Sequence, residues 1–104
     1  MSIDIVNLRT NRKAQGNAIH RGTPLGNPFV IGRDGTREEV IAQYRPWLRA
    51  QWKENGQPRA LLIQLAREYK EQGALTLLCW CKPLACHGDV IAEAVMALVR
   101  KGLV

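Results

Sequence analysis

The residue types best suited to chemistry are concentrated in one short segment near the C-terminus. Cys79, Cys81 and Cys86 fall within eight residues, and His87 follows the last of them. Residues 74–79 form an apolar run typical of a central strand, and the chain after His87 has helical periodicity. We therefore expect Cys86 and His87 at the N-terminus of the last helix. Free backbone N–H groups there favour a thiolate, a phosphate or a carboxylate.

Three interpretations of this segment are open from the sequence alone. In the first, Cys86 is an activated thiolate or His87 is an acid–base group. Gly88 would then let a ligand approach the backbone, and Asp89 would cap the helix or orient the imidazole. In the second, the three cysteines and His87 bind zinc, although their spacing differs from the usual paired C-x2-C pattern. In the third, the thiols pack as small hydrophobic groups and the polar residues only cap the helix.

A second candidate segment is the glycine- and proline-rich loop over residues 22–35. Gly26 permits a tight turn, and Asn27 offers a donor and an acceptor that suit a base edge or a ribose. Phe29 can stack on a base or seal the core. Arg21, just before the loop, can bind a phosphate. The alternative interpretation is a surface turn with no ligand.

Length and charge limit the class of protein. The 104 residues carry a net charge of +6 and are 46% hydrophobic, which suits one modest core, so we expect residues 1–104 to form one domain. The sequence lacks a transmembrane run and a secretory signal pattern, so we expect a cytoplasmic protein without a membrane partner. The odd cysteine count argues against a disulfide framework. The positive excess lies mainly in residues 1–37 and favours a polyanionic partner, unless it serves solubility alone.

The apolar pattern predicts alternating strands and helices. The expected elements are strands at residues 3–8 and 17–21, helices at 37–54 and 58–72, a strand at 74–79 and a helix at 88–101. Thr36 and Glu39 form a capping box, and Pro46 should kink or split the first helix. We predict an α/β fold, a small open sheet of about three strands flanked by helices, with the last strand central and covered on both faces. Ligands of such sheets bind beyond the carboxyl ends of the strands, where residues 79–89 would lie.

The first predicted helix interleaves aromatic and basic residues. Tyr44, Trp47 and Trp52 lie at helical spacing beside three cationic side chains. Such a surface can bind nucleic acid. The interpretation we favour is that the rings face the core while the cations are solvated.

Two loops and one dipeptide together resemble a known family. They are the Gly-Asn-Pro-Phe loop at residues 26–29, the pair Tyr44-Arg45, and the Cys-Trp-Cys-x4-Cys-His-Gly-Asp segment at residues 79–89. This combination resembles a family of small bacterial and phage proteins catalogued as a domain of unknown function. The resemblance implies a compact intracellular domain and supplies no reaction. It admits a role in phage–host conflict or in nucleotide metabolism.

The leading hypothesis is a domain that binds, and in a stronger form also processes, a nucleotide or a nucleic-acid phosphate. The floor of its site would consist of Cys86, His87, Gly88 and Asp89. The opposite wall would consist of Arg21, Gly26 and Asn27, with apolar contact from Trp80 or Phe29. Two alternatives lack catalysis: a zinc-stabilised interaction module with Cys79, Cys81, Cys86 and His87 as ligands, and a sequence-independent nucleic-acid binder. A homodimer formed through helix faces is compatible with a narrow sheet.

Overall fold

The computed structural model describes residues 2–81 and 84–104. Its elements are, in chain order, β1 (Ser2–Asn7), β2 (Asn17–Ala18), α1 (Arg37–Lys53), α2 (Gln57–Gln72), β3 (Ala74–Cys79) and α3 (Gly88–Arg100). The α/β class and the small open sheet predicted from the sequence are confirmed. None of the described helices is long and apolar enough to span a bilayer.

The sheet is parallel and has the strand order β1-β3-β2. The register pairs Ser2 with Ala74 and Asn7 with Cys79, while the short β2 pairs Asn17 with Leu77. The apolar strand β3 is therefore central, as its composition predicted. Because all three strands run in one direction, their carboxyl ends meet at one edge of the sheet.

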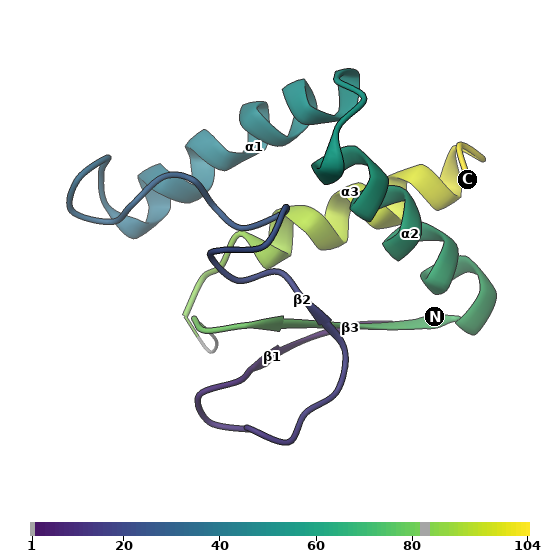
Figure 1. Ribbon diagram of the computed structural model, residues 1–104, viewed down its shortest axis with the longest axis horizontal. Coiled ribbons are helices and arrows are strands. Elements are labelled where there is room, and N and C mark those ends of the chain that lie inside the picture. The colour runs from purple at the N-terminus through teal and green to yellow at the C-terminus, as the bar shows by residue number, and fades with distance from the viewer. Residues whose placement is uncertain (1, 82–83) are drawn as a thin grey trace.

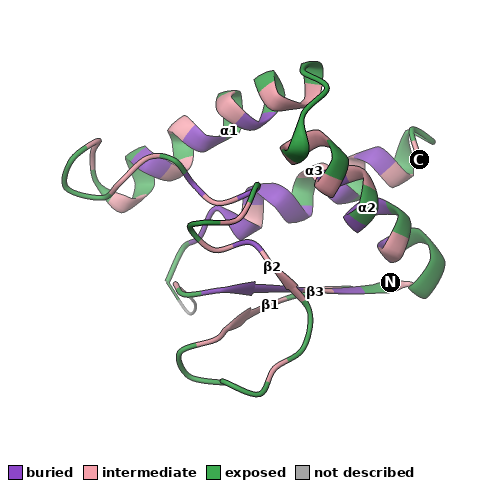
Figure 2. Cartoon of the chain, in the orientation of Figure 1, coloured by how far each residue is buried: buried purple, intermediate pink, exposed green. Residues whose placement is uncertain are grey.

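The three described helices lie on one side of the sheet (Figure 1). α2 and α3 pack against the strands, and α1 packs on α2 and α3. Leu75, Leu77 and Cys79 face this helical layer and join its core, with Ile91 and Val95 from α3 (Figure 2). The described helices therefore cover one face of β3 and do not flank it on both sides, contrary to the expectation from the sequence. Leu78, which alternates with Leu77 and Cys79 along the strand, is buried as well, so the other face of β3 is also covered near its end.

Local signals set the helix boundaries. Thr36 and Glu39 form the predicted capping box, with distances of 3.3 Å from Glu39 N to Thr36 Oγ1 and 3.0 Å from Thr36 N to Glu39 Oε1. Gly73 ends α2 in the left-handed conformation, at φ 70°. Pro46 does not split α1, which runs unbroken through it. The proline removes one backbone donor, but Tyr44 and Leu48 on either side are buried and hold the helix in place.

The second strand is shorter than predicted and ends just before the glycine–proline loop. Ile19 still donates its backbone N–H to Leu78 O at 3.0 Å, but the chain then turns. Thr23 fixes this turn through its backbone N–H and its hydroxyl, which donate to His20 O at 3.1 and 2.8 Å. His20 and Arg21 are thereby placed at the carboxyl edge of the sheet, next to the end of β3.

Candidate functional site

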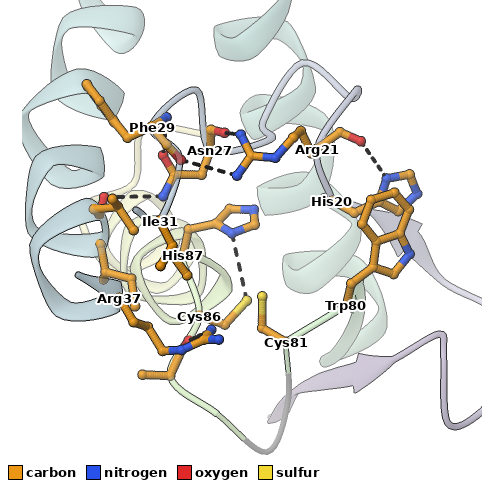
Figure 3. A pocket seen from close by; sticks show the side chains of 13 residues that line it. His20, Arg21, Asn27, Phe29, Ile31, Arg37, Trp80, Cys81, Cys86 and His87 are labelled. Atoms are coloured by element: carbon orange, nitrogen blue, oxygen red, sulfur yellow. Dashed lines mark hydrogen bonds between the residues drawn. The ribbon is translucent and has the colours of Figure 1, made fainter. Parts of the chain in front are cut away.

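A small pocket lies beyond the carboxyl ends of β2 and β3, with a volume of about 80 Å³. The two segments singled out in the sequence face each other across it (Figure 3). Asn27 and Phe29 come from the glycine–proline loop, and Cys86 and His87 come from the start of α3. The expected position of residues 79–89 at this edge is therefore confirmed for those that the structure describes.

His87 is a buried, neutral imidazole. Its Nε2 lies 2.6 Å from Ile19 O, and because a carbonyl only accepts, this nitrogen carries the proton. Nδ1 lies 3.8 Å from Cys86 Sγ. Burial lowers the pKa of His87, and the nearby charge of Arg21 lowers it further. The ring is thus fixed in one tautomer and presents its unprotonated nitrogen to the thiol.

Cys86 is not the activated thiolate that its place before a helix suggested. Its side chain is buried, and burial raises the pKa of the thiol to about 12. Gly88 N donates to Cys86 Sγ at 3.3 Å, which opposes this shift, while the neighbouring Cys79 and Cys81 add to it. The desolvation of the sulfur outweighs the single backbone donor, so the group is a neutral thiol near pH 7.

Gly88 and Asp89 serve the helix start rather than the pocket surface. A Cβ at Gly88 would lie 2.9 Å from Ile19 Cδ1. The lack of a side chain at Gly88 therefore lets Ile19, the residue after β2, pack closely against the start of α3. Gly88 is not among the residues that line the pocket. Asp89, in the first turn of α3, accepts from Cys86 N at 3.3 Å through Oδ2 and so ties the residue before His87 to the helix.

The glycine–proline loop is held by its own polar groups. A Cβ at Gly26 would lie 2.7 Å from His20 O, so this glycine permits close packing of backbone on backbone and does not line the pocket. Asn27 donates to Val40 O at 3.2 Å and accepts from Phe29 N at 2.9 Å. Its amide thus holds the loop, and Asn27 also lines the pocket, where a second N–H and a second lone pair of the amide remain. The half-buried Phe29 does line the pocket.

Two arginines flank the pocket from different parts of the chain. Arg21 donates to Asn27 O at 2.7 Å and to Phe29 O at 3.2 Å. Arg37, the first residue of α1, donates to Ala85 O at 3.2 Å. The described pocket lining includes no carboxylate. Arg37 was missed by the sequence reasoning, although the capping box at Thr36 placed it at a helix N-terminus.

An aromatic pair forms one side of the pocket mouth. The rings of His20 and Trp80 stack with centroids 4.2 Å apart and planes inclined by 8°. Arg9 brings its guanidinium carbon to 5.3 Å from the Trp80 centroid. Trp80 remains 38% exposed, so part of its surface is open to solvent. Nothing in the sequence pointed to His20, because its partner is 60 residues away.

Comparison with known proteins places the chain in a family. The sequence model described as "Domain of unknown function (DUF4326)" matches residues 6–97. The chain belongs to this family. It is also similar to an "Uncharacterized 12.4 kDa protein in nrdA-td intergenic region" of Enterobacteria phage T4, with 36% identity over 83 residues, 79% of this chain and 68% of that protein. No solved structure matches this chain.

The described sulfur atoms of this DUF4326 protein do not form a ligand set for zinc. Within residues 2–81 and 84–104, no three His, Cys, Asp or Glu side chains are arranged to hold a metal ion. Cys79 belongs to the core, whereas Cys81 lines the pocket. The arrangement therefore fits the metal interpretation poorly and leaves three free thiols.

Proposed function

We propose that this DUF4326 protein binds the phosphate of a nucleotide, or of a nucleic-acid end, in the pocket between its two loops. The observation that carries the proposal is the convergence of Arg21 and Arg37 on a pocket whose described lining has no carboxylate. Both guanidinium groups are oriented by backbone carbonyls, and each keeps further N–H donors for an anion. Arginine suits phosphate because its planar fork donates two parallel hydrogen bonds.

The fold adds to this positive field. α1 and α3 both begin at the pocket, and the positive ends of their dipoles favour an anion there. His87 contributes no charge of its own because burial lowers its pKa. It supports the site by holding the start of α3 against Ile19.

The size of the pocket indicates which part of the ligand it would hold. A volume of about 80 Å³ accommodates one phosphate group, whereas pockets that enclose a whole small molecule begin at about 300 Å³. The sugar and base would lie outside, next to the exposed part of Trp80. The base would contact the exposed part of the indole rather than stack on it, because the His20 ring and the Arg9 guanidinium lie over the Trp80 ring.

The proposal is one of binding rather than covalent catalysis. The only thiol at the start of α3, Cys86, is buried and protonated, so it is a poor nucleophile. Three free thiols are consistent with a reducing compartment such as the cytoplasm, where nucleotides are abundant.

The test compares ligands that differ only in phosphate. The four ribonucleoside 5′-monophosphates and their parent nucleosides would be titrated into the protein by calorimetry at fixed ionic strength. We expect at least one monophosphate to bind and its nucleoside to bind at least tenfold more weakly. Arg37→Gln should weaken the monophosphate about tenfold or more, because a hydrogen bond to a charged group contributes about 1.5–3 kcal/mol.

Arg67→Gln is the matched control, because it removes the same charge from an exposed position on α2, outside the pocket. It should change the affinity less than twofold. Thermal melts of both variants show whether they remain folded. Equal binding of nucleosides and monophosphates, or equal loss in both variants, would contradict the proposal.

A further inference from the structure

A second and much larger groove lies between α1 and α3. Its volume is about 680 Å³, and it shares no lining residue with the small pocket at the ends of β2 and β3. Leu62 of α2 and Leu103, which follows α3, also line it. Of the described helices, α1 lies farthest from the sheet (Figure 1).

The floor of the groove is apolar. Leu48, Leu62 and Leu98 line it and are buried, one from each helix. Two large hydrophobic side chains on its edge are exposed to solvent, Met96 at 41% and Leu103 at 57%. An apolar floor with exposed apolar edges is the usual property of a surface that a partner covers.

The rim is cationic. Arg45, Arg49 and Lys53 follow one another at intervals of four residues and so form a row along one face of α1. Arg100 and Lys101 add charge at the end of α3. The single acidic residue in the described lining, Glu93, pairs with Arg45. The groove therefore has a clear excess of positive charge above an apolar floor.

We propose that this groove binds an acidic amphipathic helix of a partner protein. Such a helix would place apolar side chains at positions i, i+3 or i+4 and i+7 on the floor, and carboxylates against the cationic rim. A second copy of this chain fits less well, because facing grooves would bring two cationic rows together. A nucleic acid would use the rim but has no apolar face to cover the floor.

The test uses a fluorescein-labelled 18-residue peptide of Leu and Glu, with Leu at helical positions i, i+3, i+4 and i+7. A scrambled peptide of the same composition keeps the charge and loses the apolar face. Fluorescence anisotropy should show binding of the amphipathic peptide that is at least tenfold tighter than binding of the scrambled one. Equal binding of both, or no binding, would overturn the proposal.

Variants of the protein locate the binding. Arg49→Glu reverses a charge on the rim, and Ala97→Trp fills the groove from α3. Each should weaken the amphipathic peptide at least tenfold, while Arg67→Glu on the exposed face of α2 should change it less than twofold. Thermal melts show whether the variants remain folded. If single-stranded DNA displaces the peptide completely, or Arg49→Glu abolishes self-association in sedimentation, the occupant is a different one and the proposal fails.

Discussion

At the residue scale, Tyr44 and His87 join the two loops into one site. Tyr44 is fully buried, and its hydroxyl donates to Leu25 O at 2.7 Å, which holds the glycine–proline loop. Its ring lies 5.1 Å from the ring of His87, whose Nε2 holds Ile19 O on the other side. Burial raises the pKa of Tyr44, so the phenol stays protonated and remains a donor. Tyr44 and His87 thus hold the glycine–proline loop and the start of α3 in place around the pocket.

The lowered pKa of His87 makes stability depend on pH. The unfolded chain takes up a proton at this residue below about pH 6.5, and the folded chain does so only at a lower pH. The free energy of unfolding should therefore be constant above this pH and decrease as the pH falls below it. His87→Gln keeps a donor for Ile19 O but cannot titrate.

Urea unfolding between pH 7.5 and 5.5 checks this prediction. The wild-type protein should lose stability over this range, and His87→Gln should lose clearly less. Identical pH slopes for the two proteins would mean that His87 is not protected from protonation in the fold.

At the scale of elements, the position of Arg37 depends on the start of α1. Thr36→Ala removes the side-chain acceptor of the capping box and should lower the free energy of unfolding by about 1 kcal/mol. It should also weaken monophosphate binding, because Arg37 is the next residue. Thr36→Ser keeps the hydroxyl and should restore both properties. If Thr36→Ala frays the helix without affecting binding, Arg37 does not contact the ligand.

Elements were predictable from the sequence wherever the signal is local. The capping box at Thr36, the left-handed Gly73 and the apolar β3 each depend on a few neighbouring residues. The split predicted at Pro46 is absent because burial of the flanking Tyr44 and Leu48 outweighs the local cost of the proline. The effect of a proline in a helix is set by what the helix packs on.

The site was predictable only in part. The sequence predicted that the glycine–proline loop and the cysteine–histidine segment lie at one site, and residues of both line the same pocket. The neutral state of Cys86 was not predictable, because it results from burial in a core that distant strands and helices form around it. The hydrogen bond from Arg37 to Ala85 O was not predictable either, because it joins residues 48 positions apart. Interactions across such separations depend on the register of the sheet and the packing of the helices.

At the scale of the whole molecule, two separate concave sites are lined by basic side chains. One is the small pocket at the carboxyl edge of the sheet, and the other is the groove between α1 and α3. The net charge of +6 also permits sequence-independent binding of nucleic acid. That alternative predicts an affinity that falls steeply between about 50 and 200 mM salt and involves many basic residues at once. A defined phosphate site predicts a response confined to one edge of the fold.

The most direct test is an NMR titration of the isotope-labelled protein with a ribonucleoside monophosphate at 150 mM salt. We predict saturable shifts of the Arg21 and Arg37 side-chain signals and of the Trp80 indole, with Arg49 and Lys53 unaffected. Shifts spread over basic residues on every face, shifts confined to the α1–α3 groove, or no shift at millimolar ligand would contradict a phosphate site between the two loops.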